Sequence, residues 1–473
     1  MMRKRTFRLA AGLLATICLM GCGATQSVPD GSKESISGGD TAKSSEASES
    51  TVSSKGADGT GSEGTVVLTL WGGVPAEAGP QASCDEFNKL YKDKGIEVEY
   101  QRFVNDETGN MKLETNLLSG EGVDLYMTYT FDSLAKRAEG GMALDLSDLM
   151  SAEGYDEKKY LGDMAEAYYV DGKPYSIPTK LDKYGIVLNK DMFDEAGIDI
   201  PTDWTIDEFR EIAKKLTHGE GQDKVYGMFW NSQQDLTYPI SYIAAQTLGG
   251  DPMYKSPTES NFTDPVNVAA IDLVNTMMNV DGTAPTHTDS VTQKLSQEGM
   301  FLTGKCAMTV GPWMIRSIKD TATYPHDFET AFAPYPVVAE GQRKYTQGGY
   351  GDLLCINPKS EHIKEAWEFA KWYASEGMLE VTKGGRVPAY NTYDSSVVTK
   401  AFLDGAENLL DADTTENVLI KPADNYAVPS ITNHISEVKK CLTDEVEKIL
   451  IGQESTEAGM KNAKIAADKI LQQ

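Results

Sequence analysis

Residues 66–100 read VVLTLWGGVPAEAGPQASCDEFNKLYKDKGIEVEY, and this stretch decides the fold class. The apolar run Val66–Trp71 predicts a buried strand, which two glycines end. In residues 80–91 a proline suits the first helical turn, and apolar side chains then recur at helical spacing. Residues 96–100 alternate between apolar and charged, which is typical of a strand. The stretch is therefore a strand–helix–strand unit, which predicts an α/β fold with a parallel sheet.

Further elements are predicted along the rest of the chain. Thr205 and Glu208 have the spacing of a capping box, with Trp204 and Phe209 at the positions of a hydrophobic staple, so Trp204 is expected to be structural. Trp367 lies on the apolar face of a predicted helix and is expected in the core. Other predicted elements are strands at 124–127, 306–310 and 353–356, a hairpin at 168–177, and helices at 361–376 and 455–471.

The folded part from Thr65 onward has about 410 residues, more than one hydrophobic core typically supports. This length suggests two lobes. Residues 22–64 lack aromatic side chains after a single cysteine and are rich in Ser, Gly and Thr. Such a composition buries too little apolar surface to offset its ordering entropy, so we expect a disordered tether.

The first 22 residues predict where the protein works. Four basic residues precede a short apolar run, which is too short to remain as a membrane-spanning helix. The run ends in Leu19-Met20-Gly21-Cys22, which resembles a bacterial lipobox. We expect residues 1–21 to be a signal peptide and Cys22 to carry lipid, so that the protein is anchored at the extracellular face of the cell membrane. The alternative is an ordinary secretory signal with a chance cysteine.

The charge and the cysteines exclude several kinds of partner. Loss of the four positive charges in residues 1–21 changes the formal net charge from −27 to −31, which disfavours nucleic acid and anionic lipid headgroups. The cysteines show no spacing typical of a metal site, and we expect no metal and no cofactor. Cys306 and Cys355 could form a disulfide if their strands are neighbours; buried free thiols are the alternative.

A block of motifs carries a family resemblance. Residues 171–178 read DGKPYSIP, residues 184–193 read YGIVLNKDMF, and EAGI and PTDWT follow at 195–198 and 201–205. This pattern is similar to the family 1 extracellular solute-binding proteins, the maltose-binding-protein type that serves ABC importers. Further matches in order are Gly249-Gly250, Phe301, Gly304-Lys305, Ala307-Met308, Gly311-Pro312-Trp313, residues 333–336, Gly348-Gly349, residues 365–369, Glu376-Gly377 and residues 387–389.

The resemblance covers essentially all of residues 65–473 and implies a type II two-lobe fold with the ligand in a cleft between hinged lobes. Lobe 1 would contain residues 65–180 and 340–387, and lobe 2 residues 181–339 and 388–473. It also implies a monomer that works with the transmembrane subunits of an ABC permease.

A sugar site needs flat aromatic rings for the C–H faces and carboxylates or amides for the hydroxyls. Trp71, Tyr129 and Asp132 qualify because they follow predicted strands, where ligands bind in open α/β sheets. The resemblance adds Trp313, Asp182, Trp230 and Asp235. Tyr350, Arg386 and Tyr426 are weaker candidates. Several of these residues also have a structural alternative. Trp71 would pack against the end of the sheet, Trp230 would cover the end of a strand inside lobe 2, and Trp313 would pack in the core. Tyr129 and Asp132 would lie in a surface turn, and Asp182 would be an exposed carboxylate at the hinge.

We therefore expect a binding protein that captures a carbohydrate, most simply an oligosaccharide, and delivers it to a permease. Alternatives are a binding protein for a peptide or organic phosphate, and a sensor that presents its ligand to a receptor kinase. A surface glycoside hydrolase would need only two carboxylates, but no local motif frames such a pair, and the chain lacks H-E-x-x-H and G-x-S-x-G. We expect no enzymatic activity.

Overall fold

The computed structural model describes residues 64–311, 314–431 and 433–473, all within the unit Thr60–Gln473. Cys22, the tether and Trp313 lie outside the described residues. The expected lipid anchor and the expected ligand contact of Trp313 therefore stay predictions.

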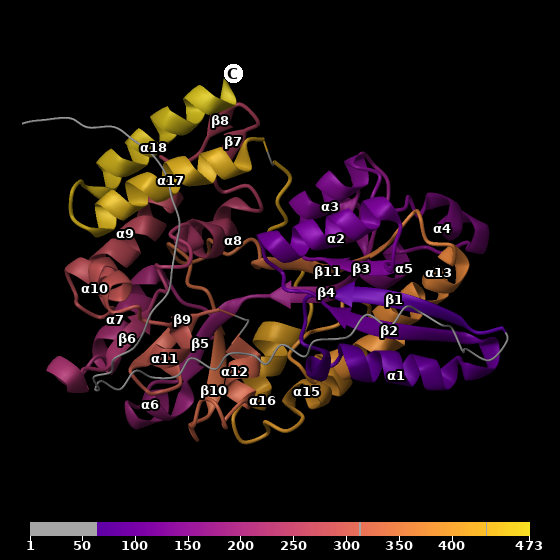
Figure 1. The fold of residues 1–473 in the computed structure, drawn as a ribbon. Coiled ribbons are helices and arrows are strands. Elements are labelled where there is room, and N and C mark those ends of the chain that lie inside the picture. The colour runs from indigo at the N-terminus through magenta and orange to yellow at the C-terminus, as the bar shows by residue number, and fades with distance from the viewer. Residues whose placement is uncertain (1–63, 312–313, 432) are drawn as a thin grey trace, which may run out of the picture. The chain divides into compact units, whose positions relative to one another are not determined.

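The first sheet has five strands in the order β2-β1-β3-β11-β4 (Figure 1). β2, β1 and β3 are mutually parallel, whereas β11 runs antiparallel to both β3 and β4. The helix α1 (Pro80–Leu90) connects β1 to β2, which confirms the predicted strand–helix–strand unit. The strand bounds are Val66–Gly72 for β1, Ile96–Arg102 for β2, Leu125–Thr128 for β3, Ile177–Lys183 for β4 and Gly348–Ile356 for β11.

The second sheet has four strands in the order β10-β5-β9-β6, with only β6 and β9 parallel. The bounds are Gly185–Asn189 for β5, Tyr226–Phe229 for β6, Cys306–Val310 for β9 and Thr330–Pro334 for β10. Its largest apolar core also takes side chains from α7 (Ile206–Leu216), α9 (Pro265–Asn279), α17 (Ile435–Leu450) and α18 (Thr456–Leu471). The structure is thus a mixed α/β protein built on two separate sheets.

The remaining elements are mostly short. The other helices are α2 (Glu107–Ser119), α3 (Phe131–Glu139), α4 (Ser147–Glu153), α5 (Lys158–Leu161), α6 (Lys190–Glu195), α8 (Ala245–Leu248), α10 (His287–Thr292), α11 (Gln297–Phe301), α12 (Ile315–Lys319), α13 (Ile363–Trp372), α14 (Met378–Thr382), α15 (Ser395–Leu403) and α16 (Ala412–Thr414). A two-stranded ribbon joins β7 (Tyr254–Ser256) and β8 (Glu259–Ser260). The 3₁₀ and π turns are η1 (Ala76–Ala78), η2 (Lys92–Lys94), η3 (Asp163–Tyr168), η4 (Gly221–Asp223), η5 (Pro239–Ala244), η7 (Tyr373–Gly377) and η8 (Thr415–Ile420).

The chain passes between the two sheets at defined places. Tyr184 alone separates β4 of the first sheet from β5 of the second. The chain returns between β10 and β11, and a later segment runs beside β4, where the amide of Leu181 donates to the carbonyl of Val387 at 2.9 Å. The exact lobe boundaries stay a prediction.

Local sequence signals explain why several elements begin where they do. At α7 the Thr205 Oγ1 accepts from the amide of Glu208 at 3.3 Å, while the Thr205 amide donates to the Glu208 carboxylate at 2.8 Å. The rings of Trp204 and Phe209 meet edge to face at 5.0 Å. The capping box, the structural role of Trp204 and the core position of Trp367, which is 2% exposed, are all confirmed.

The disulfide considered for Cys306 and Cys355 does not form. Cys306 lies on β9 and Cys355 on β11, which belong to different sheets, and both are fully buried free thiols. Burial raises the pKa of Cys306 and raises that of Cys355 to about 11. The alternative of buried free cysteines is the correct one.

Candidate functional site

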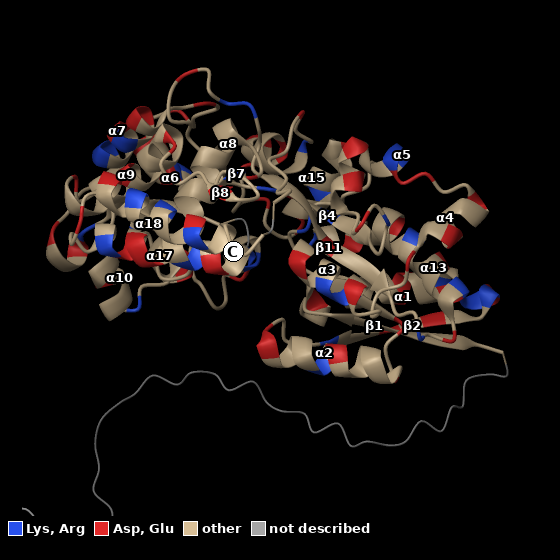
Figure 2. Cartoon of the chain, turned by 90° about the horizontal axis from the view of Figure 1, so that it is seen from above, with Lys and Arg blue, Asp and Glu red and all other residues tan. Residues whose placement is uncertain are grey.

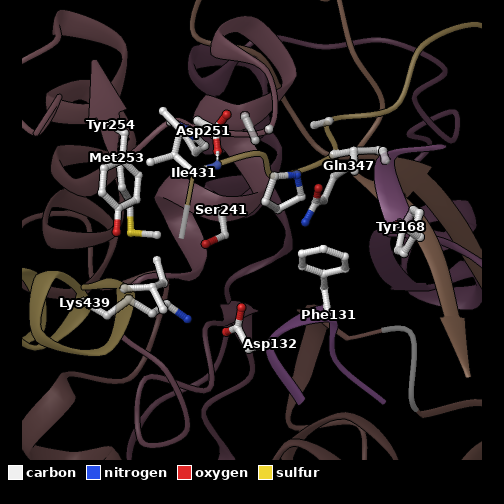
Figure 3. Close-up of a pocket in the computed structure, with 18 of the residues that line it drawn as sticks. Phe131, Asp132, Tyr168, Ser241, Asp251, Met253, Tyr254, Gln347, Ile431 and Lys439 are labelled. Carbon is white, nitrogen blue, oxygen red and sulfur yellow. Dashed lines mark hydrogen bonds between the residues drawn. The ribbon is translucent and has the colours of Figure 1, made fainter. Parts of the chain in front are cut away.

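A cavity of about 330 Å³, termed the large cavity below, brings together side chains from five distant parts of the chain (Figure 3). Two cavities elsewhere have larger volumes, of about 380 and 540 Å³. One group follows β3, ends η3, or lies at the start of β11, next to the first sheet. The other group comes from η5 to β7 and from the segment that leads into α17. The lining residues are Phe131, Asp132, Ala167, Tyr168, Ser241, Ala245, Gly250, Asp251, Pro252, Met253, Tyr254, Gln347, Tyr350, Ala427, Val428, Pro429, Ile431, Ile435 and Lys439.

Three aromatic residues form one wall of this cavity. The Tyr168 ring lies 6.3 Å from Phe131, edge to face, and 5.5 Å from Tyr350. The Tyr168 hydroxyl accepts from the amide of Tyr350 at 2.6 Å, and the Tyr350 hydroxyl donates to the carbonyl of Leu161. Burial raises the pKa of both tyrosines. The wall is therefore neutral at physiological pH and held in place by hydrogen bonds.

The opposite wall is built around Asp251 and Tyr254. The Asp251 carboxylate accepts from the amides of Ser430 and Ile431 at 2.8 and 2.9 Å, and the Tyr254 hydroxyl donates to the carbonyl of Asn433 at 2.9 Å. Burial, then the charge of Asp251, raises the pKa of Tyr254 to about 12. These groups tie the segment before α17 to β7, so they shape the cavity rather than offer free ligand contacts.

Four polar side chains remain to meet a solute: Asp132, Ser241, Gln347 and Lys439, all of which reach the cavity in Figure 3. Asp132 lies exposed in the first turn of α3, and within the described part of the chain it makes no hydrogen bond or ion pair. Lys439 Nζ lies 3.5 Å from Asp235 Oδ2. Together these side chains supply a carboxylate, an amide, a hydroxyl and an ammonium beside aromatic rings.

The structure brings some of the predicted site residues together. Asp132 and Tyr350 both line the cavity, and Asp235 contacts it through Lys439. Asp182 and Arg386 line a separate cavity, where each already has an oppositely charged neighbour. The ligand-binding roles of these five residues stay proposals.

Trp71 and Trp230 were predicted as ligand contacts; both are buried among the described residues, and their contact with a ligand stays a prediction. Trp71 is 3% exposed and its indole N–H donates to the carbonyl of Gly122 at 2.9 Å. Trp230 is 4% exposed and packs against Phe209 with ring centroids 5.8 Å apart. Both rings lie in hydrophobic cores, which is the placement that the two structural alternatives describe.

Tyr129 and Tyr426 are turned to local partners and do not line the large cavity. The Tyr129 hydroxyl accepts from the amide of Gly73 at 2.5 Å, and the Tyr426 hydroxyl accepts from the amide of Ala423 at 3.0 Å. Their predicted ligand contacts therefore gain no support from this cavity and stay predictions.

Sequence reasoning missed several lining residues, most clearly Tyr168, Tyr254, Gln347 and Lys439. Phe131 could have been found, because it lies between Tyr129 and Asp132 and obeys the same rule about strand ends. The other four belong to no local motif, since only the folded chain places them together.

No helix among the described residues is both long and apolar enough to cross a membrane. A search of the same residues finds no group of three or more His, Cys, Asp or Glu side chains that could hold a metal ion.

Comparison with known sequences identifies the family. Residues 73–380 match the family model described as bacterial extracellular solute-binding protein. A putative binding protein of Brucella abortus is 25% identical over 378 residues, which cover 76% of this chain and 82% of the relative. An uncharacterized lipoprotein of Streptomyces antibioticus is 28% identical over 293 residues, which cover 60% of each chain.

Solved structures show the same fold. A sugar transporter from Rhizobium etli in an open conformation has a TM-score of 0.68 at 20% identity, covering 85% of this chain and 99% of the other. An ABC substrate-binding protein from Listeria monocytogenes in complex with cycloalternan has a TM-score of 0.67 at 22% identity, with 86% and 98% covered. A cyclic alpha-maltosyl-1,6-maltose binding protein from Arthrobacter globiformis has a TM-score of 0.65 at 20% identity, with 86% and 100% covered.

Proposed function

The chain belongs to the bacterial extracellular solute-binding proteins, and from this premise we propose that it captures a carbohydrate and delivers it to an ABC permease. The solute would be an oligosaccharide rather than a single sugar. The protein would work as a monomer at the extracellular face of the membrane, held there by lipid on Cys22.

The observation that carries this proposal is the composition of the large cavity. Its volume of about 330 Å³ falls in the usual range for small-molecule sites. Phe131, Tyr168 and Tyr350 offer apolar ring surface to the C–H face of a sugar. Asp132 has unused acceptor capacity for hydroxyl groups, and Gln347 can both donate and accept. A hydroxyl-rich solute with apolar C–H faces satisfies both kinds of surface.

The names of the structural relatives support the same class of solute. The Listeria protein is described in complex with cycloalternan, the Arthrobacter protein as binding cyclic alpha-maltosyl-1,6-maltose, and the Rhizobium protein as a sugar transporter. These ligands belong to those proteins. They motivate the choice of glycans with which to test this chain.

Binding and release require no chemical step, so no residue is given a catalytic role. The ligand would act by stabilising a closed arrangement of the two halves over an open one, which requires a higher affinity for the closed state. The permease would then recognise the closed arrangement that the ligand favours.

Calorimetry and thermal unfolding against a panel of linear and cyclic malto-oligosaccharides test the solute class. At 100 times the Kd, a ligand adds about 2.7 kcal/mol of stability. We expect Asp132→Asn to weaken binding by roughly tenfold to a hundredfold, since hydrogen bonds to a charged acceptor contribute about 1.5–3 kcal/mol. Asp199→Asn, a change of the same kind at an exposed residue far along the chain, is the matched control and should bind normally.

Stabilisation by a peptide or an organic phosphate, with no response to any saccharide, would contradict the solute class. The anchor is tested separately by mass spectrometry of the mature N-terminus and by cell fractionation. We expect a lipidated Cys22, and Cys22→Ser should move the protein from the membrane to the medium. An unmodified N-terminus at another residue would contradict the anchor.

A further inference from the structure

A second cavity, of about 150 Å³, has a charge opposite to that of the whole protein. Four of its lining residues are basic (Lys180, Lys183, Arg316 and Arg386), whereas only Asp182 is acidic. The chain as a whole has a formal net charge of −27, and the red segments in Figure 2 mark Asp and Glu residues on helices of both halves, including α2, α4 and α17. A basic cavity in an acidic protein needs a specific explanation.

Among the residues that the structure describes, ion pairs neutralise two of the four cations. Lys180 Nζ lies 2.5 Å from Asp182 Oδ1, and Arg386 Nε lies 2.7 Å from Oδ2 of the buried Asp352. Lys183 instead donates to main-chain carbonyls of Asn417 and Lys421, at 3.2 and 2.6 Å. Burial, with the charge of Lys421, lowers the pKa of Lys183 to about 8. The positive charge of Lys183 is therefore solvated by dipoles and not by a carboxylate.

Arg316 is the group best placed to meet a ligand. It lies on α12 with an exposed side chain, and within the described residues it makes no hydrogen bond or ion pair. Desolvation, then the charges of Arg386 and Arg102, lower the pKa of Arg316, while Glu77 raises it. Arg102 ends β2 of the first sheet, so positive groups from both halves of the chain act on one another here.

A planar oxyanion would relieve this repulsion. The guanidinium group presents a rigid fork of N–H donors that matches a carboxylate in two-point contact, and such charge-assisted bonds are stronger than neutral ones. A cavity lined by one sign of charge also concentrates ions of the opposite sign. An anion beside Arg316 would reduce the unfavourable interactions with Arg102 and Arg386.

We propose that the second cavity binds the carboxylate of an acidic sugar residue, with Arg316 as its principal partner. This inference rests on the proposed carbohydrate function and narrows it: the preferred solute carries a uronic acid.

Trigalacturonate and its fully methyl-esterified form are the matched probes, because esterification removes the charge and keeps the sugar. We expect calorimetry on the mature protein to show binding of the acid at least tenfold tighter than the ester, with a difference that shrinks in high salt. Arg316→Gln should abolish the preference for the acid over the ester. Arg316→Lys should keep part of it, and Lys440→Gln, which removes an exposed charge on α17, should keep all of it.

Equal affinities for the acid and the ester, or a preference that survives Arg316→Gln, would contradict the inference. If neutral malto-oligosaccharides bind and trigalacturonate does not, the inference is wrong and the proposed function stands. If inorganic phosphate stabilises the protein through Arg316 and no saccharide does, the proposed function is wrong and the cavity serves a free oxyanion instead of a uronic acid.

Discussion

Lys439 Nζ on α17 lies 3.5 Å from Oδ2 of Asp235, and this contact joins the large cavity to the segment that follows β6. Asp235 also lines a much smaller cavity beside Trp230. Sequence reasoning named Asp235 as a ligand residue, whereas its neighbour Lys439 reaches the large cavity. The Asp235 carboxylate therefore holds the Lys439 ammonium group in place at the cavity.

The two oxygens of Asp235 have separable roles. Oδ1 accepts from the amide and hydroxyl of Thr237, both at 2.7 Å. Asp235→Asn keeps an acceptor for Thr237 and removes the ion pair, so we expect a loss of less than about 1 kcal/mol, because exposed pairs contribute little. Asp235→Ala also removes the two hydrogen bonds and should cost about 1–2 kcal/mol more. Urea unfolding measures both; equal losses for the two variants would contradict this assignment.

Arg137 is an almost fully buried cation that depends on Glu114. Its guanidinium donates to Thr128 at 2.8 Å and Asn110 at 2.6 Å, and Glu114 lies 3.5 Å from Nε. Removal of one partner leaves a buried charge uncompensated. Because the Glu114 side chain is partly exposed, we expect Glu114→Gln to cost about 1–3 kcal/mol in the free energy of unfolding. Glu139→Gln, an exposed change on the same helix as Arg137, should cost less than about 0.5 kcal/mol.

Glu157 makes stability depend on pH. Burial raises its pKa to about 7, and the hydrogen bond from Tyr169 lowers it only in part. Between pH 4.5 and 7 the folded state therefore binds more protons than the unfolded state, so stability is lost as pH rises through this window. Glu157→Gln should remove this loss of stability. At pH 8 the free energy of unfolding of the variant should exceed that of the native protein by a value on the order of 2 kcal/mol. Glu121→Gln, at an exposed residue, should leave the dependence of unfolding free energy on pH unchanged. If the stability difference between Glu157→Gln and the native protein is also independent of pH, the prediction is wrong.

The four cysteines of the folded part should react as free thiols of unequal access. Cys84, Cys306 and Cys355 are buried, and only Cys441 is partly exposed. Burial raises the pKa of Cys84 to about 12, which further slows its reaction. Mass spectrometry after alkylation should find one label, at Cys441, in the native protein and four in denaturant without reductant. A pair that reacts only after reduction would show a disulfide and contradict the structure.

Periodic and local signals predicted much of the fold. The strand–helix–strand unit at 66–100, the strand Cys306–Val310 and the helix capped by Thr205 depend on contacts within a few residues, or on alternation that the chain displays directly. The family resemblance supplied the two-part architecture that such signals do not contain. Length alone only required more than one core.

The candidate site was less predictable for a physical reason. A large aromatic residue at a strand end can face a ligand or fill the core, and the surrounding apolar volume decides; Trp71 and Trp230 both fill cores. Asp132 follows a strand, so position alone found it. Lys439 lies within α17 on a charged face that is typical of a solvent-exposed helix surface. Only the packing of α17 brings this side chain to the cavity.

The single-residue joint between β4 and β5 limits how this protein can change in evolution. Side chains alternate faces along a strand, so an insertion or deletion of one residue at Tyr184 would turn every β5 side chain to the wrong face, or shift its pairing with β9 and β10. Gly185 tightens this limit, because a Cβ atom there would lie 2.5 Å from the carbonyl oxygen of Ala333. Variation in length between related sequences should therefore gather in the surface loops and spare this joint.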